Sequence, residues 1–235
     1  MTNLRDVTDR ADLLFDKCHF EEACNLLRQH LENNEYEILW RLARALYSLY
    51  KELHFQQLKM AADAAITEGF QIASKLLEAN PDSSAAHKYY AIFFGEKAGI
   101  AGTKQQIMAL GKVLVHIQTA KRLMVDEDPF VWHLEGAFYE KLASLQWYEK
   151  LFVYGLNKDL VRPTYEDALQ CLLKAENIKA QFLSLNQFLI GKVYFLQKEF
   201  QKARPYLTRV AQLEAIRTAD DRFSKESAKK LLESD

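Results

Sequence analysis

Glycine and proline are scarce in this sequence, which has eight of the first and four of the second among 235 residues. All-β sandwiches and barrels need many tight turns, and these two residues dominate such turns, so the composition argues against both folds. With 49% apolar residues, the chain is long enough to bury a core of its own. We therefore expect a mainly helical protein.

Cysteine is also scarce, and Cys18, Cys24 and Cys171 form no CxxC pair. An odd number of cysteines without that spacing suits the free thiols of a reducing compartment rather than a disulfide framework. The six histidines lack the HExxH pattern, and Cys18 and Cys24 do not have a zinc spacing. We expect neither a bound metal nor a cofactor.

Long apolar runs are missing, because no segment approaches the roughly 20 residues of a membrane-spanning helix. The richest stretch, Leu142–Leu156, is interrupted by Gln146, Glu149 and Lys150. The first ten residues mix arginine with aspartate and contain no apolar segment typical of a signal peptide. We expect a protein of the cytosol without a membrane-spanning segment.

The chain has no excess of one charge, with 31 basic and 32 acidic residues, which argues against a nucleic-acid-binding protein. The two signs are separated along the chain, however. Residues 1–100 carry 11 basic and 15 acidic side chains (net −4), whereas residues 141–209 carry 11 and 6 (net +5). A local positive field attracts an anionic partner even when the whole molecule is near neutral.

The basic side chains of the later segment predict a positively charged surface for an anionic filament. Its members are Lys150, Lys158, Arg162, Lys174, Lys179, Lys198, Lys202 and Arg204. The alternative is a solvated helix face without a partner.

Helical periodicity runs through most of the sequence, and proline marks the clearest stops, at Asn80-Pro81, Asp128-Pro129 and Arg162-Pro163. Two segments 55 residues apart share one pattern within a helix. The matching positions are Trp132, Gly136 and Tyr139 in the first segment and Gln187, Gly191 and Tyr194 in the second. We expect the small residue to let a neighbouring helix approach closely.

Each of these helices is followed by a second one with its own apolar spacing. The positions are Tyr165, Ala168, Leu172 and Ala175 after the first, and Phe200, Ala203, Leu207 and Val210 after the second. The pair resembles the tetratricopeptide (TPR) repeat, a stacked helical hairpin. Weaker copies cover residues 2–33, residues 39–80 with an extended connection between the two helices, and residues 87–125 with a glycine-containing break at 95–102.

The tail, residues 220–232, has Phe223 and Ala228 on one side and lysines on the other, which is typical of a terminal capping helix. We therefore expect an all-α, TPR-like helical repeat solenoid with irregular insertions. It would form a single domain over residues 1–235 with four to five helix pairs.

Three segments have more than one interpretation. Leu145–Leu156 is apolar on more than one face, so we expect an extra helix packed across the solenoid, with a lipid or peptide pocket as the alternative. Gly95–Lys104 lacks the GxxxxGK[ST] spacing of a phosphate loop, so we expect a flexible connection there. The acidic cluster at Asp126–Asp128 is expected to cap the following helix rather than to bind a cation.

Several short sequence segments contain residues that the TPR repeat pattern does not require. They are Leu39-Trp40-Arg41-Leu42-Ala43-Arg44-Ala45, His87-Lys88-Tyr89-Tyr90-Ala91-Ile92, Trp147-Tyr148, Thr164-Tyr165-Glu166-Asp167-Ala168-Leu169 and Gly191-Lys192-Val193-Tyr194. In this order the chain resembles the regulator of microtubule dynamics family from about Ala11 to Leu213. The resemblance implies a non-enzymatic TPR-like protein that associates with tubulin at spindle microtubules and supports chromosome segregation.

A TPR array lines a concave groove with its first helices, and helix positions 5, 9 and 12 point into it. The groove residues predicted in this way are Trp40, Arg44, Tyr47, Lys88, His133, Glu140, Phe188, Lys192 and Phe195. Their cations and rings suit an extended acidic segment, such as a peptide tail or the tubulin tails that the resemblance implies. The alternative for Trp40 and Phe188 is packing between repeats.

Two other functions stay open. A lipid or hydrophobic-ligand binder is suggested by the aromatic insertion and by members of the family at membrane contacts. A generic peptide-binding adaptor would use the same groove. No catalytic constellation is visible, so we do not expect an enzyme.

Overall fold

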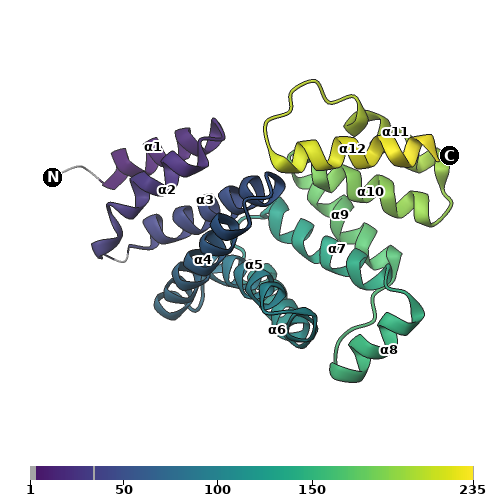
Figure 1. Cartoon of the computed structure of the whole chain (residues 1–235), viewed down its shortest axis with the longest axis horizontal. Coiled ribbons are helices and arrows are strands. Elements are labelled where there is room, and N and C mark those ends of the chain that lie inside the picture. The colour runs from purple at the N-terminus through teal and green to yellow at the C-terminus, as the bar shows by residue number, and fades with distance from the viewer. Residues whose placement is uncertain (1–3, 34, 235) are drawn as a thin grey trace. The chain divides into compact units, whose positions relative to one another are not determined.

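The computed structural model describes residues 4–33 and 35–234, and every regular element in this part of the chain is a helix (Figure 1). The elements are α1 (Leu4–Asp16), α2 (Phe20–Arg28), the 3₁₀ turn η1 (Leu31–Asn33), α3 (Tyr36–Phe55), α4 (Lys59–Ala79), α5 (Ser84–Ile100), α6 (Thr103–Arg122), α7 (Pro129–Ala143), α8 (Trp147–Leu156), α9 (Tyr165–Ile178), α10 (Ser184–Leu196), α11 (Phe200–Ala211) and α12 (Ala219–Glu233). The predicted all-α class is confirmed. None of the helices described is long and apolar enough to cross a membrane.

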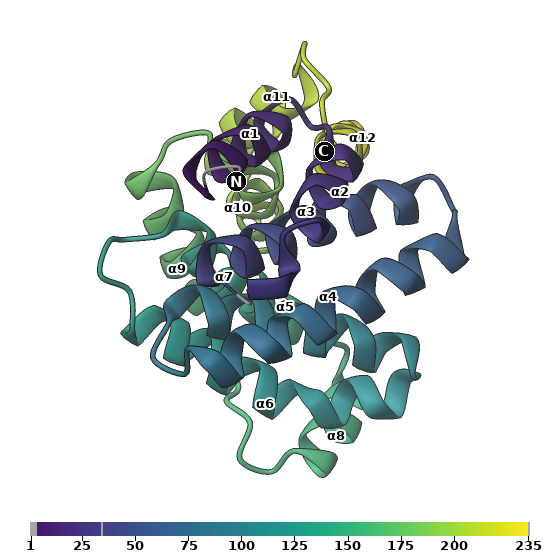
Figure 2. The same cartoon turned by 90° about the vertical axis from the view of Figure 1, so that its left-hand side faces the viewer.

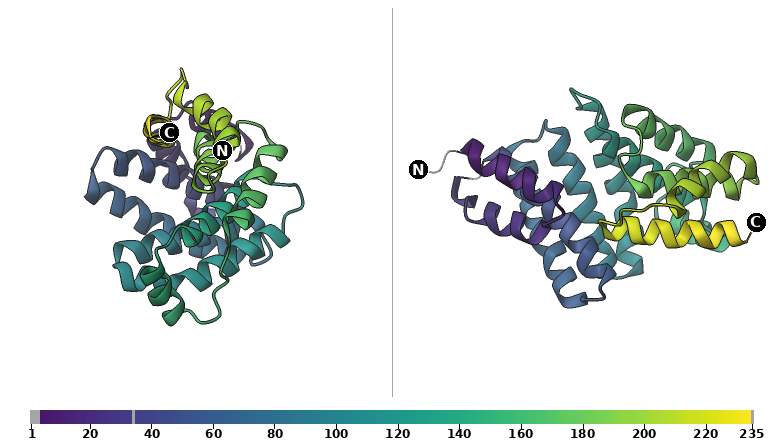
Figure 3. Two further views of the ribbon diagram at one scale, coloured as in Figure 1. Left: turned by 90° about the vertical axis from the view of Figure 1, so that its right-hand side faces the viewer. Right: turned by 90° about the horizontal axis from the view of Figure 1, so that it is seen from above.

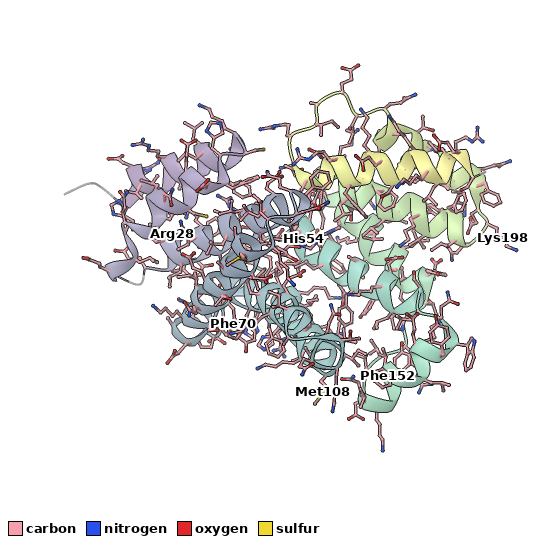
Figure 4. All side chains as sticks on the ribbon, viewed as in Figure 1. Arg28, His54, Phe70, Met108, Phe152 and Lys198 are labelled. Carbon is pink, nitrogen blue, oxygen red and sulfur yellow. The ribbon has the colours of Figure 1, made fainter. Side chains whose placement is uncertain are left out.

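The chain divides into two compact units, Met1–Leu123 and Met124–Asp235. In the first unit, α1 pairs with α2, α3 with α4 and α5 with α6, and each hairpin packs on the next (Figure 2). Arg28 of α2, labelled in Figure 4, donates from Nε and Nη2 to the two carboxylate oxygens of Glu68 on α4, both at 2.7 Å. The expectation of one domain over the whole chain stays a prediction.

In the second unit, α7 pairs with α9 and α10 with α11. The capping helix α12 packs against both α10 and α11, as predicted (Figure 3). Ala228 of α12 belongs to the same buried cluster as Leu172 of α9, Ile190 of α10 and Leu207 of α11. Ala137 of α7 also packs against this cluster, so α7, α9, α10, α11 and α12 share one apolar core.

Three hairpins share one turn conformation. Cys18, Gln57 and Lys198 have φ values of 61°, 62° and 63°, and each lies between the two helices of a pair. In each turn two amides donate to carbonyls of the last turn of the first helix: Cys18 to Phe15 and His19 to Leu14, Gln57 to His54 and Leu58 to Leu53, and Lys198 to Phe195 and Glu199 to Tyr194. This is the Schellman pattern, in which a left-handed residue ends the helix. The three hairpins thus repeat the same backbone conformation and hydrogen bonds at their turns.

Glycines let the paired helices approach closely, as the two matching segments predict. A Cβ on Gly136 would lie 2.7 Å from Leu172 Cγ and 3.0 Å from the Leu172 backbone nitrogen. At Gly191 it would lie 2.8 Å from Leu207 Cγ. Gly69 makes the same kind of contact in the first unit, where a Cβ would lie 2.0 Å from the ring of Phe93, and the sequence pattern missed it.

Two predicted irregularities are wrong. The connection between α3 and α4 is only three residues, Gln56–Leu58, because both helices are longer than expected. The break predicted at 95–102 is helical up to Ile100, and only Ala101 and Gly102 separate α5 from α6. Gly95 lies inside α5, and a Cβ placed on it would lie at an ordinary van der Waals distance, 3.4 Å, from Val113 Cγ2 of α6.

Side-chain caps begin α7, α9 and α12 of the second unit. Asp128 accepts from the amide of Phe130 at 2.8 Å, so the capping role predicted for the acidic cluster is confirmed at this residue. Thr164 and Asp167 form a capping box at the start of α9, and Thr218 and Asp221 form one at the start of α12. The backbone amide of Thr164 donates to Asp167 at 2.7 Å and lowers the pKa of that carboxyl.

The helix predicted at 145–156 exists as α8, but its expected packing across the solenoid is wrong. Val153 is its only buried residue among those described. The helix projects from the second unit between two connections, away from α7 and α9 (Figure 1). Its apolar residues face outward because no other helix of the unit lies over them.

Candidate partner-binding surfaces

In the first unit, the predicted groove residues Trp40 and Arg44 belong to a compact ionic cluster. Arg41 of α3 donates to the carboxylate of Asp12 on α1 from Nε at 3.0 Å and from Nη2 at 2.9 Å, and Arg44 pairs with the same carboxylate. Arg41 also pairs with Glu37. The guanidinium carbon of Arg41 lies 4.3 Å from the Trp40 ring centroid.

The electrostatics of this cluster tie its cations to the fold. Partial burial raises the pKa of Asp12, but the hydrogen bonds and charges of Arg41 and Arg44 outweigh that effect, so the pKa lies below its usual value. Arg44 also covers the ring of Phe15 at 4.0 Å. The cluster therefore joins α1 to α3, and much of the positive charge of Arg44 is already balanced by Asp12.

Tyr47 and Lys88, the other groove residues of this unit, are half-buried. Tyr47 makes an edge contact with Phe93 at 6.2 Å between ring centroids, and Lys51 lies 4.8 Å from the Tyr47 ring. Lys88 extends over the ring of Tyr89 at 4.8 Å. Both side chains retain a solvent-exposed part that a partner can reach.

In the second unit, His133, Glu140 and Phe188 are buried, so their predicted place on an open groove is corrected. His133 Nδ1 lies 3.0 Å from Asn186 Oδ1, and the Asn186 amide in turn donates to the Leu172 carbonyl at 3.1 Å. Phe188 is covered by Phe223 of the capping helix, with the ring centroids 5.9 Å apart.

Lys192 of α10 is paired with Glu140 of α7, with Nζ 2.8 Å from Oε1. The hydroxyl of Ser144 donates to the same oxygen at 2.7 Å. Phe195 packs edge-on against Phe200 at 5.3 Å. The Lys192–Glu140 ion pair joins α7 and α10, which are the first helices of two neighbouring repeats. The Glu140 carboxylate is nearly inaccessible to water.

The predicted basic residues are far more accessible than the predicted groove. Lys179, Lys198, Lys202 and Arg204 are exposed at the end of α9, after α10 and on α11, and Figure 4 shows Lys198 at the edge of the unit. Lys202 pairs with Glu199. Lys174, which is half-exposed, pairs with Glu127 at 2.7 Å.

The other three predicted cations lie on α8 and in the connection that follows it. Lys150 is half-buried, and Lys158 and Arg162 are exposed. The Arg162 guanidinium lies 4.8 Å from the ring of Tyr154. The eight basic residues thus form two groups, one around α8 and one on α9 to α11.

A histidine pair escaped prediction because its members are 29 residues apart and on different helices. His87 Nδ1 of α5 lies 2.9 Å from His116 Nδ1 of α6, and His87 Nε2 lies 2.8 Å from the Pro81 carbonyl. The ring of Tyr90 lies 4.6 Å from that of His116. Burial, followed by the charges of His87 and Lys112, lowers the pKa of His116 to about 4.

Sequence comparison gives one consistent result over nearly the whole chain. The family model described as "Regulator of microtubule dynamics protein 1-3" matches residues 7–234. Regulator of microtubule dynamics protein 1 of Bos taurus is 30% identical over 97% of this chain and 71% of its own length. The Caenorhabditis elegans protein of that name is 27% identical over 91% of this chain and 92% of its own length.

Among solved structures, a thermophilic TPR protein of Thermus thermophilus is similar in fold, with a TM-score of 0.62. The match covers 97% of this chain and 98% of that one, at 13% sequence identity. The fold is therefore TPR-like, in agreement with the helical hairpins and their repeated turns.

Proposed function

Because this chain belongs to the regulator of microtubule dynamics family, we propose that it is a non-enzymatic microtubule-associated protein that binds tubulin. We further propose that it acts in the cytoplasm at spindle microtubules and supports chromosome segregation. Membership of the family is the observation that carries the proposal. The exposed cations of the second unit supply the chemistry, since tubulin presents acidic tails to its partners.

The exposed residues Lys179, Lys198 and Arg204 are the proposed contacts on α9 to α11. Each exposed ion pair contributes only about 0.2–1 kcal/mol, so binding would depend on several pairs formed together. This surface is favoured over the predicted groove. The groove is less accessible, because His133, Glu140 and Phe188 are buried.

Cosedimentation with polymerised tubulin tests the proposal. The variant carries Lys179→Glu, Lys198→Glu and Arg204→Glu, which reverses three exposed charges. The matched control carries Lys17→Glu, Lys59→Glu and Lys75→Glu, three exposed lysines of the first unit. We expect the first variant to lose most of its binding, at least tenfold, and the control to lose much less, because only the first removes the local positive field.

Three results would contradict this mechanism. A wild-type chain that stays in the supernatant at low and moderate salt would exclude direct binding. Equal losses in the two variants would exclude a special role for α9 to α11. Unchanged binding to microtubules stripped of their acidic tails by limited proteolysis would exclude those tails as the ligand. A lipid found by native mass spectrometry of the purified protein would support the lipid-binding alternative instead.

A further inference from the structure

Helix α8 carries an outward face that is entirely apolar. The exposed fractions are 74% for Trp147, 57% for Tyr148, 67% for Leu151, 54% for Phe152 and 43% for Leu156. Together with the exposed Gly155, these residues recur at i, i+1, i+4, i+5, i+8 and i+9, which is one side of a helix. The two charged residues of α8, Glu149 and Lys150, lie outside this face.

A face of this size is unusual on a protein surface. A fully covered aromatic side chain buries about 150–250 Å², so three aromatics and two leucines with exposed fractions between 43% and 74% present on the order of 500 Å². Apolar patches of several hundred Å² commonly mark a site of interaction. The face is also rich in aromatic residues and free of charge, as the centre of a protein–protein interface is.

From these features we propose that α8 is the contact between two copies of this chain, which pair with their α8 helices antiparallel. The face has a bulky end, Trp147 and Tyr148, and a small end at Gly155. Among the described residues, no atom outside the nearby backbone of α8 and the two chain neighbours lies within 4 Å of a Cβ placed on Gly155, so the space above it is open. A two-fold axis near Leu151 and Phe152 sets Tyr148 of one copy over Gly155 of the other, and the reverse.

The size and the charges of the surface both favour a second copy. Two such faces bury about 1,000 Å² together, which reaches the lower limit of a specific interface and fits a weak, reversible dimer. The charges beside the face are of both signs, Glu149 and Asp159 with Lys150, Lys158 and Arg162, so they leave only a small positive excess. A helix that lies on an anionic membrane instead has a strongly basic polar face.

Sedimentation velocity of the full chain across the micromolar range tests the proposal. The wild type should shift with concentration from 27.3 kDa towards twice that mass. The variant Leu151→Glu, Phe152→Glu places charge at the centre of the face and should stay at the mass of one chain. The matched control, Met60→Glu, Val125→Glu, changes two residues that are 89% and 98% exposed and should associate as the wild type does.

A second variant tests the antiparallel register. Gly155→Leu fills the recess that Tyr148 of the other copy would enter, and it should weaken association at least tenfold while the helical content by circular dichroism stays unchanged. The proposal is overturned by a wild type that remains monomeric throughout the range. It is also overturned by a Leu151→Glu, Phe152→Glu variant that associates normally, or by a monomer that instead pellets with anionic phospholipid vesicles.

Discussion

At the residue scale, the close helix contacts depend on single missing side chains. Gly136 allows α9 to approach α7 until the Leu172 backbone itself is within contact distance of a would-be Cβ. A flexible side chain can move aside, but a backbone nitrogen cannot move without shifting the helix. The glycine is therefore required by packing, although glycine lowers helix propensity.

Substitution of Gly136 measures this contact. We expect Gly136→Ala to destabilise the fold by about 1–3 kcal/mol, because the added methyl group overpacks the α7–α9 contact. Gly155→Ala is the matched control and should be neutral or stabilise by up to about 1 kcal/mol, because alanine is the better helix former. Urea unfolding of both variants, at a concentration where the chain is monomeric, gives the comparison. Equal effects of the two substitutions would contradict a tight contact at Gly136.

The stability of the first unit should depend on His116. The pKa of this ring is about 4 in the folded chain, against 6.5 for an unperturbed histidine. Between these pH values the unfolded chain binds more protons, so stability is complete above pH 6.5 and falls as the pH decreases to about 4. The half-exposed ring should account for about 1–2 kcal/mol once screening by solvent is allowed for.

The thermal midpoint of unfolding as a function of pH tests this dependence. The variant His116→Gln should flatten the decrease between pH 6.5 and 4, whereas His30→Gln should leave it as in the wild type. If the thermal midpoint of the His116→Gln variant falls as much as that of the wild type, the loss of stability arises from groups other than His116.

At the scale of elements, the sequence predicts helices better than their ends. A proline lies shortly before α5 and α9 and at the first residue of α7. Because proline restricts the backbone of its immediate neighbours only, these helix boundaries could be predicted from the sequence. The continuation of α5 through Gly95 was not, because glycine lowers helix propensity locally and the packing of α5 on α6 lies outside that local pattern. The exposure of α8 was not either, since burial of an apolar helix is decided by what other segments cover it.

The hairpin turn between α3 and α4 offers a test at this scale. Gln57 is held at φ 62°, a conformation that costs a residue with a Cβ about 1–2 kcal/mol. Gln57→Gly should therefore stabilise the fold by about 0.5–1 kcal/mol, after the greater flexibility of glycine in the unfolded chain is subtracted. Its neighbour Gln56 has φ −76°, so Gln56→Gly should destabilise the fold. Urea midpoints that move in the same direction for both variants would contradict this account.

At the scale of the whole molecule, the near-zero net charge of −1 conceals a separation that the sequence already contains. The basic residues of α9 to α11 were predictable because long charged side chains on the polar side of a helix stay in solvent. The groove was not, because the partners of its residues, Asp12, Asn186 and Glu140, are 32 to 53 positions away from them. Pairing at that distance leaves no local pattern.

The charge separation predicts how the proposed microtubule binding depends on salt. We expect the affinity in cosedimentation to fall several-fold from low to moderate salt, because exposed charges are screened within about 10 Å at 0.1 M ionic strength. The net charge alone would predict repulsion from an acidic filament, which salt relieves. Binding that strengthens with added salt would therefore contradict an electrostatic attachment.

Lys198 belongs both to a left-handed turn and to the proposed microtubule contact. Its backbone, at φ 63°, would favour glycine, whereas its ammonium group is exposed at the edge of the second unit. Selection for thermal stability would thus favour glycine at position 198, whereas selection for microtubule binding would favour lysine. A library of variants screened only for thermal stability should therefore be enriched in glycine at position 198. The enriched variants should be more stable and bind tubulin with lower affinity.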